Sequence, residues 1–390
     1  MATYAFETIT AEQALNIQPT DIVTFAGGPA NRASVVYQSY DPAALTAEVP
    51  SILVTIGGRT VKFDTNLVRV SDAGGLQFAD GSVLVVGDTG DERASGGDGH
   101  DGLYGGPAAD TVAGGKGDDL LQGNAGDDAL DAGSGTNTVY GGKGDDEIVA
   151  ARDTDRTGSF AHGNQGNDDI VGGGGADTLL GGQGDDFLGG GDGDDYLSGD
   201  LGADELHGGD GADTLIGGEG DDTIQSGGGA DRVLAGAGDD QVAIFYGGGA
   251  IVDGGAGNDT ITSASVGKDV LSGGEGRDLF VFVAKNDPAQ GQDDVILDWN
   301  AVDDRIQFDQ VSIYTILPRS YSEFVATDYA EATRIAQEHI MFTGAQYVAA
   351  QVGADVVIFA DTNADSSDGA DISLVLAGRT LADISLASFV

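Results

Sequence analysis

Aspartate residues recur every nine residues through the middle of the sequence, each after a glycine-rich stretch. Residues 181–198, GGQGDDFLGGGDGDDYLS, contain this nine-residue unit twice, with an aspartate at the sixth position counted from the first glycine. Glycine loses much conformational freedom on folding, and closely spaced carboxylates repel one another. The combination becomes favourable if a cation lies between the carboxylates. The chemistry that these residues can perform is therefore metal binding.

The units begin at Gly96 and continue to Gly273, with an interruption at residues 150–162 and two units, at Phe245 and Ala264, displaced by one residue. We expect weak or empty sites at Asn137, at Ala250 and near Ala108, where the pattern departs from glycine or aspartate. The other sixth-position aspartates are the predicted metal ligands. They are Asp101, Asp119, Asp128, Asp146, Asp168, Asp177, Asp186, Asp195, Asp204, Asp213, Asp222, Asp231, Asp240, Asp259 and Asp278.

The composition of the units favours Ca²⁺ over other metals. Calcium accepts six to eight oxygen ligands in loose geometry, whereas Mg²⁺ demands a tight octahedron. Zinc and copper are disfavoured because the chain has no cysteine and only 4 histidines. Glycine turns can direct main-chain carbonyls at the ion and supply the remaining ligands. We expect several calcium ions, roughly ten.

An all-β solenoid is the fold that can position these turns. A glycine-rich turn followed by a short strand makes half a coil, so two units return the chain to a place beside its start and the strands stack in parallel. The eighth position is apolar in every regular unit and is predicted to point inward, which argues against disorder. That column is Leu103, Val112, Leu121, Leu130, Val139, Ile148, Ile170, Leu179, Leu188, Leu197, Leu206, Leu215, Ile224, Val233, Val242, Ile261 and Phe280.

The unit GGxGxDxUx, where U is a large apolar residue, resembles the nonapeptide of the RTX (repeats-in-toxin) family. The run from Gly163 onward is contiguous, and such a run is far more specific than a single copy. The resemblance implies a parallel β-roll with calcium along both rows of turns. It also implies that the sixth-position aspartates are ligands, together with carbonyls near the glycines. The glycines predicted to take part are Gly172, Gly181, Gly190, Gly199, Gly208 and Gly217.

The sequence divides into three regions of different composition: residues 1–86, the repeats at 87–281, and residues 282–390. The first is predicted to be a small β-rich domain, with strands in 21–25, 33–40, 51–63 and 76–86 and a short helix from Ala11 to Leu15 capped by Thr10. Hairpins are predicted at Gly57-Gly58 and at Asp80-Gly81. The last region is predicted to be a β-rich cap with a helix over 327–340 that starts at Thr327.

The C-terminal region resembles the segment that caps β-rolls in serralysin-like secreted proteins. We expect strands in 278–282, 293–308, 354–363 and 370–390, and the tail ending in Phe389-Val390 resembles the uncleaved signal of type I secretion substrates. Asp361, Asn363 and Asp365 begin like an EF-hand, but Ser366 and Ile372 replace its glycine and glutamate. A calcium loop of another kind stays an open alternative there.

The net charge of −48 excludes an ordinary nucleic-acid-binding role and disfavours anionic lipid. The lack of cysteine favours an extracellular location weakly. The N-terminus has no basic segment followed by an apolar run, and no stretch is long and apolar enough for a transmembrane helix. We therefore expect a secreted protein whose export signal lies at the C-terminus and whose partner is the type I secretion machinery.

No catalytic motif accompanies the repeats. His100, His162, His207 and His339 are scattered, there is neither HExxH nor GxSxG, and we expect no enzyme. The first hypothesis is a structural protein that folds on binding Ca²⁺ outside the cell and self-assembles as a homo-oligomer, lattice or fibre, as in a surface layer or biofilm matrix. The alternative is a calcium-dependent adhesin or carbohydrate-binding protein, with a cell-surface polysaccharide as partner. Its candidate sugar-stacking residues are Tyr37, Tyr40, Phe245, Tyr246 and Trp299, and residues 152–160 are a candidate basic contact.

Overall fold

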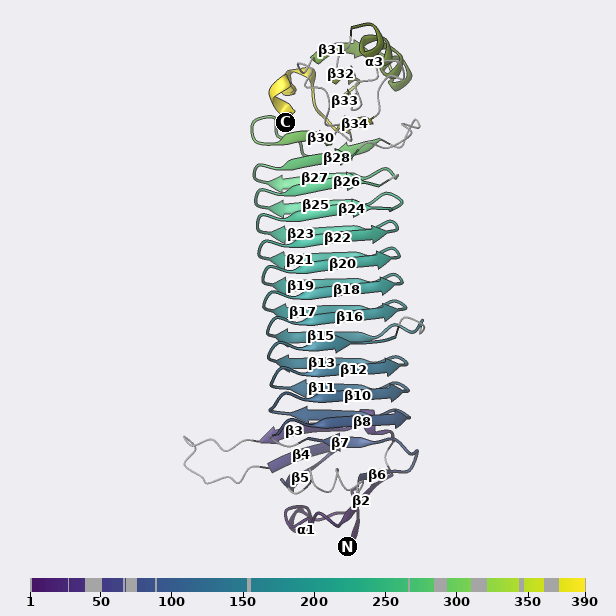
Figure 1. The fold of residues 1–390 in the computed structure, drawn as a ribbon, viewed down its shortest axis with the longest axis vertical. Helices are drawn as coiled ribbons and strands as arrows, with labels where there is room; N and C mark the ends of the chain where they lie inside the picture. The colour runs from purple at the N-terminus through teal and green to yellow at the C-terminus, as the bar shows by residue number, and fades with distance from the viewer. Residues whose placement is uncertain are drawn as a thin grey trace, which may run out of the picture. The chain divides into compact units, whose positions relative to one another are not determined.

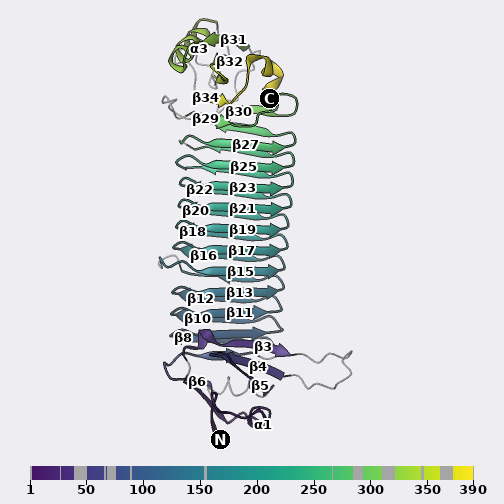
Figure 2. The same cartoon turned by 180° about the vertical axis from the view of Figure 1, so that it is seen from behind.

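A computed structural model describes residues 2–26, 28–38, 51–65, 67, 76–87, 90–152, 156–265, 267–283, 293–309, 321–343, 347–360 and 372–389. The chain divides into two compact units, Met1–Gly193 and Asp194–Val390, which are described separately. The all-β prediction is confirmed: both units contain coils of a parallel β-solenoid (Figures 1 and 2). Among the described residues, no helix has the length and apolar character needed to cross a membrane.

The first unit begins with two small three-stranded sheets. One is parallel, with β1 (Thr3–Ala5), β2 (Ile22–Phe25) and β6 (Leu76–Phe78), and the other is antiparallel, with β3 (Ser34–Gln38), β4 (Ser51–Ile56) and β5 (Arg59–Asp64). Stacked phenylalanines such as Phe25 and Phe78, with ring centroids 4.4 Å apart, fill the core. Helix α1 (Ala11–Ala14) is capped by Thr10, as predicted.

The two predicted hairpins have different outcomes. Strands β4 and β5 form the hairpin at Gly57-Gly58, and both glycines have positive φ. At Asp80-Gly81 the hairpin is limited to one antiparallel bridge, between Gln77 and Val83, because β6 and β7 (Leu84–Val86) belong to different sheets. The reason is packing: Leu84 and Val86 are buried, and β7 pairs in parallel with the first coil of the roll.

Two parallel sheets of short strands form the roll in the first unit. Partners are mostly eighteen residues apart, as in the pairing of Val112 with Leu130. One sheet contains β8 (Arg93–Asp98), β10 (Thr111–Lys116), β12 (Ala129–Ser134), β14 (Glu147–Val149), β16 (Asp169–Gly174) and β18 (Phe187–Asp192). The other continues from β7 through β9 (Gly102–Gly106), β11 (Leu120–Asn124), β13 (Thr138–Lys143), β15 (Phe160–Gln165) and β17 (Thr178–Gln183).

The second unit repeats this arrangement. One sheet contains β20 (Glu205–Asp210), β22 (Thr223–Gly228), β24 (Gln241–Phe245), β26 (Thr260–Ala264), β28 (Leu279–Val283) and β30 (Arg305–Asp309). The other contains β19 (Tyr196–Leu201), β21 (Thr214–Glu219), β23 (Arg232–Ala237), β25 (Ile251–Ala256), β27 (Val270–Glu275) and β29 (Asp294–Ile296). Two inserted residues, Ile244 and Ser263, lengthen the pairing interval to nineteen.

A C-terminal sheet continues from β29 through β34 (Ile372–Leu376), β33 (Asp355–Ala360), β32 (Tyr347–Val352) and β31 (Tyr321–Ala326). Helix α3 (Tyr329–Thr343) packs on β32 through small residues such as Ala332 and Ala336. The helix was predicted to start at Thr327; instead the Asp328 carboxylate accepts the Glu331 N–H and caps it, while Thr327 bonds to the Glu331 side chain. Short 3-10 turns at Leu381–Asp383 and Leu386–Ser388 end the described chain.

The predicted inward column is confirmed, because every eighth-position residue from Leu103 to Phe280 is at most 2 % exposed. Ala161, Val252 and Leu271 continue that column through the irregular coils. The glycines permit the turns: at Gly220, φ is +124°, and a Cβ would lie 1.9 Å from the Gly202 carbonyl oxygen. The candidate loop of Asp361, Asn363 and Asp365 lies outside the described residues.

Candidate metal centre

The predicted metal-binding aspartates are all buried, each at most 3 % exposed. Each lies in the turn that leads into a roll strand, one residue or so before the strand begins. We call the residues that precede even-numbered strands the even row and those that precede odd-numbered strands the odd row. Buried carboxylates in such number are unusual and need compensating partners.

In the even row, each carboxylate accepts a main-chain hydrogen bond from the aspartate one coil earlier. The Asp128 Oδ1 accepts the Asp110 N–H at 2.7 Å, and the Asp146 Oδ1 accepts the Asp128 N–H at 2.8 Å. The same bond, at 2.8–3.2 Å, links Asp146 to Asp168, Asp168 to Asp186, Asp204 to Asp222, Asp222 to Asp240, Asp240 to Asp259, Asp259 to Asp278 and Asp278 to Asp304.

The odd row follows the same rule where it carries aspartate. The Asp119 Oδ1 accepts the Asp101 N–H at 2.8 Å, and the Asp213 and Asp231 carboxylates accept from Asp195 and Asp213. Asp177 accepts from the N–H of Ser159, at 2.6 Å. One oxygen of each ladder carboxylate is therefore satisfied by the backbone of the preceding coil.

At Asp101 the second oxygen, Oδ2, accepts the Gly97 N–H at 2.8 Å, but at most of the other positions it has no such bond. In the part of the chain that the structure describes, these Oδ2 atoms are buried and lack any hydrogen-bond partner at Asp119, Asp128, Asp146, Asp168, Asp213, Asp222, Asp240 and Asp259. A buried carboxylate oxygen without a partner costs a free energy of about 1–3 kcal/mol or more. A ligand that supplies positive charge removes this cost.

The first glycine of each unit shows what the Oδ2 atoms face. A Cβ built on Gly123 would lie 2.1 Å from Asp128 Oδ2 and 2.7 Å from the Gly141 carbonyl oxygen, which belongs to the next coil. A carboxylate oxygen and a carbonyl oxygen thus share a space that glycine leaves open, although Ser226 and Ala235 hold this first position in their units. The same pair of oxygens surrounds Gly114, Gly172, Gly208, Gly217 and Gly254.

These oxygen atoms are suitable ligands for calcium. The groups are hard oxygens, they come from a carboxylate and the main chain, and no hydrogen-bond donor separates them. Among the described residues, no three acidic or histidine side chains converge on one point, so main-chain carbonyls must complete any coordination shell. When bound, Ca²⁺ supplies the positive charge that the carboxylates lack, and the aspartates with the neighbouring carbonyls would hold it.

The predicted glycines occupy this first position. Gly172, Gly199, Gly208 and Gly217 each lie against the Oδ2 of the aspartate in their own unit, at 2.1–2.6 Å from a built Cβ. The Gly190 carbonyl oxygen is one of the two oxygens around Gly172. Gly181 holds the equivalent position in β17. Their role is to leave room and to direct carbonyls inward.

Burial shifts the titration of these carboxylates strongly. It raises the pKa of Asp128 and of Asp222 to about 7, with neighbouring aspartates adding to the rise and the main-chain hydrogen bond opposing it. Burial, with Asp168 and Asp128 nearby, raises the pKa of Asp146 to about 8. Without a cation, the neutral acid is therefore favoured near neutral pH.

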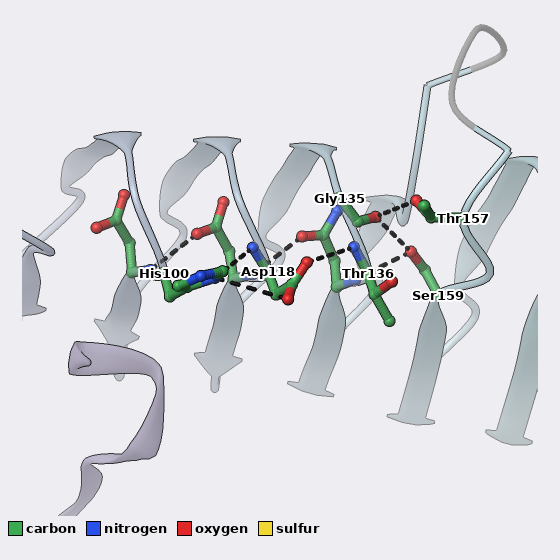
Figure 3. Close-up of polar contacts among 9 residues, drawn as sticks. His100, Asp118, Gly135, Thr136, Thr157 and Ser159 are labelled. Atoms are coloured by element: carbon green, nitrogen blue, oxygen red, sulfur yellow. Dashed lines mark hydrogen bonds and ion pairs between the residues drawn. The ribbon is translucent and has the colours of Figure 1, made fainter. Parts of the chain in front are cut away.

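A second ladder, at the fifth position, was missed in the sequence. The Asp221 Oδ1 accepts the Asp239 N–H at 2.8 Å, so this bond runs in the opposite direction along the coils. At the start of the roll the Asp118 N–H donates to His100 Nδ1, and Asp118 accepts from the Thr136 N–H (Figure 3). The fifth-position side chains are exposed, and Asn167 and Asn258 serve there equally well.

The structure also extends the buried rows beyond the predicted set. Asp269 accepts the Ala250 N–H, Asp294 accepts the Asp269 N–H, and Asp304 accepts the Asp278 N–H. All three are buried. The signal that could have found them is an aspartate two residues before an inward apolar residue, as in Asp304-Arg-Ile306.

The structure shows what lies at the three positions where the repeat pattern is broken and weak or empty sites are predicted. Asn137 is buried in the odd row and accepts the Asp119 N–H through Oδ1. Ala250 is buried where an aspartate would stand and offers no carboxylate. Asp110, after Ala108, still joins the even row by accepting the Glu92 N–H at 2.8 Å.

The sequence model of the RTX calcium-binding nonapeptide repeat matches the roll in eight segments: 86–121, 114–148, 122–156, 162–197, 171–206, 189–224, 207–242 and 246–280. The gaps between them, at 157–161 and 243–245, coincide with the interruption and with the inserted Ile244. The repeat region of this chain is therefore made of RTX calcium-binding nonapeptide repeats.

Two solved structures are similar to parts of the chain. The AlgE6R3 subunit of the mannuronan C5-epimerase from Azotobacter vinelandii is 25% identical, with a TM-score of 0.23, over 44% of this chain and 78% of that one. The extracellular lipase LipA from Serratia marcescens is 18% identical, with a TM-score of 0.19, over 61% of this chain, which spans only 45% of the lipase. None of the curated proteins matches the chain.

Replacing one ladder carboxylate tests the assignment of the fifth and sixth positions. In Asp222→Asn, Oδ1 can still accept the Asp204 N–H, but the charge for calcium is lost. We expect the free energy of unfolding in saturating calcium to fall by about 2–3 kcal/mol, the value of one saturated site. Asp221→Asn, one residue away and exposed, is the matched control and should leave stability and calcium affinity unchanged. Equal effects of the two variants in a calcium titration followed by thermal unfolding would contradict the assignment.

The raised pKa values predict how the chelated protein responds to pH. In the roll, the pKa of buried carboxylates such as Asp213 and Asp259 is about 7, against 3.8 when they are unfolded. Between these values the folded state holds protons that the unfolded state has released, so the free energy of unfolding falls as pH rises. Circular dichroism of protein from which calcium has been removed beforehand should show β-structure that is fullest below about pH 4 and lost by about pH 8. Light scattering measured on the same samples identifies aggregation near the isoelectric point. A circular dichroism signal for β-structure that grows as the pH rises would contradict the prediction.

Proposed function

We propose that this chain, with its centre made of RTX calcium-binding repeats, is a secreted structural protein that folds and self-assembles outside the cell on binding Ca²⁺. A surface-layer or biofilm-matrix scaffold is the class of protein that fits. The buried Oδ2 atoms carry this proposal, because a roll lined by partnerless carboxylates, in a chain of net charge −48, needs cations to be stable.

Calcium acts in this proposal as the folding switch. Calcium-binding extracellular modules have dissociation constants of roughly 10⁻⁴–10⁻³ M, far above the calcium concentration inside a cell. Each site that binds only the folded state contributes about 1.4 kcal/mol when free calcium is tenfold above the dissociation constant. With roughly ten such sites, the roll would stay unfolded during export and fold outside.

Two edge strands support self-assembly. Among the described residues, β3 and β31 are the last strands of their sheets, and each exposes a valine: Val36 is 50% and Val325 73% exposed. An open edge with apolar side chains can add a strand from another molecule. A second copy of this chain offers such strands.

Export through the type I machinery and the absence of catalysis are part of the same proposal. The C-terminal tail resembles a type I signal, and in the folded chain its Phe389 stacks on Tyr347 with ring centroids 4.5 Å apart. One segment can therefore serve export while unfolded and cap the fold afterwards. The sequence contains none of the hydrolase motifs that often accompany such repeats.

The alternative, a carbohydrate-binding adhesin, has one specific observation in its favour. Tyr246 is 90% exposed, has a φ of +58° that is unusual for a large side chain, and lies beside Phe245. Trp299, however, is fully buried against Phe280, so its predicted role in sugar stacking is wrong. The Tyr37 side chain and Tyr40 lie outside what the structure describes.

Chelation tests the proposed folding switch. In excess EGTA at neutral pH we expect the β-sheet signal in circular dichroism to be largely lost, because each buried carboxylate must then take up a proton or keep its charge without a partner. Electron microscopy of the pure protein should show sheets or fibres with calcium and none without it. A complete fold that persists in EGTA would sink the proposal. Calcium-loaded monomers that bind glycan would favour the adhesin.

Substitution of the edge valines tests self-assembly separately from folding. The double variant Val36→Lys with Val325→Lys should abolish the ordered assemblies and leave the calcium midpoint of folding unchanged, since lysine on an edge strand blocks pairing. The added positive charge lowers the net repulsion, so lost assembly would not be a charge effect. Val302→Lys, at a residue 75% exposed in a turn, is the control and should assemble normally. Assembly that survives in the double variant rules out these edges.

A further inference from the structure

In the first unit, the odd row has neutral side chains instead of aspartate at Asn137 and Ser159. Both side chains are buried, at 1% and 5% exposure, and both are neutral. The Asn137 Oδ1 accepts the Asp119 N–H at 3.0 Å, and its Nδ2 donates to the Ala150 carbonyl at 3.0 Å. Both ends of the amide are thus bonded within the protein.

Ser159 is hydrogen-bonded to Asn137, and we call this pair of neighbouring odd-row residues a rung. Its Oγ accepts the Asn137 N–H at 3.1 Å and donates to the Gly135 carbonyl, while Thr157 Oγ1 donates to that carbonyl at 2.9 Å (Figure 3). The Ser159 N–H continues the ladder to Asp177. The interruption of the repeat therefore supplies hydroxyl and amide groups where other coils have carboxylates.

The even row of the same coils provides an internal comparison. Asp128, Asp146 and Asp168 are buried to the same degree, yet each keeps an Oδ2 without a partner. Burial raises the pKa of each of these carboxylates. Within one pair of coils, one row depends on a cation and the other is already satisfied.

A second place in the odd row keeps its carboxylate but satisfies Oδ2 with hydroxyl groups. In the second unit, Ser263 and Ser265 donate to Asp269 Oδ2 at 2.7 and 2.9 Å. Asp259, in the even row of the same coil, has an Oδ2 with no partner among the described residues. Ser263 is the inserted residue of that coil, so here too an irregularity of the repeat brings the hydroxyl.

We propose that hydrogen-bonded rungs of the odd row, Asn137 with Ser159 above all, hold their part of the roll without metal. The coils around them are then the nucleus from which calcium-driven folding extends. The inference rests on the proposed calcium-driven folding and specifies where in the chain it starts. Its physical basis is that this rung has neither the repulsion between carboxylates nor an orphaned oxygen.

Hydrogen exchange of the full chain, read by mass spectrometry, tests the proposal. In excess EGTA at neutral pH, peptides covering β13 and β15 should exchange at least about tenfold more slowly than peptides covering β20 to β23, where both rows carry aspartate. In saturating calcium the two regions should be equally protected. Uniformly fast exchange in EGTA would overturn this proposal and leave the proposed function standing. Uniformly slow exchange would overturn both.

A double variant that introduces carboxylates at Asn137 and Ser159 tests whether their neutrality matters. Asn137→Asp with Ser159→Asp should remove the residual protection in EGTA and raise the calcium concentration needed for half-folding by at least about twofold. Its fold in saturating calcium is checked by circular dichroism. Asn167→Asp adds an exposed fifth-position charge in a neighbouring coil and is the control. Retained protection in the double variant, or its loss in the control as well, would contradict the assignment.

Discussion

The repeat depends on a buried carboxylate with two different oxygens. Oδ1 accepts a main-chain hydrogen bond, whereas Oδ2 lies near a carbonyl oxygen and has no donor. Each ladder aspartate uses Oδ1 to bind the backbone of the preceding coil, which fixes the stacking of coils. The same geometry directs Oδ2 at a carbonyl of the following coil. The interaction that sets the register of the solenoid thus also leaves the partnerless oxygen on which the proposed calcium switch rests.

The remaining features of the unit follow from this arrangement. Glycine predominates at the first position because a Cβ would enter the space between the two oxygens, as at Gly217. Later glycines need positive φ and stack on carbonyls of the neighbouring coil, as Gly220 does on Gly202. Each strand adds an aliphatic residue such as Leu215 to the core between the two sheets, and the ladder bonds link successive coils.

Most of this fold is encoded locally, which is why the sequence predicts it well. A nine-residue period determines which side chains point inward, and the buried column from Leu103 to Phe280 agrees with it at every regular unit. What the period cannot reveal is long-range pairing: β7 joins the roll and leaves only one bridge of the predicted hairpin, and Trp299 packs in the core instead of facing a ligand. The fifth-position ladder was also hidden, since Asp221 and Asp222 are the same residue type with opposite exposure.

Adjacent aspartates in one turn therefore have different physical roles. At the fifth position the carboxylate is exposed and acts as a hydrogen-bond acceptor, which asparagine replaces at Asn167 and Asn258 without change of geometry. At the sixth position the charge itself matters. Where asparagine occurs there, at Asn137, the chain supplies a carbonyl for the amide and a hydroxyl from Ser159. At Asn137 and Ser159 the neutral residues of the buried row come with new hydrogen bonds, so these irregular coils are an alternative solution to the same electrostatic constraint.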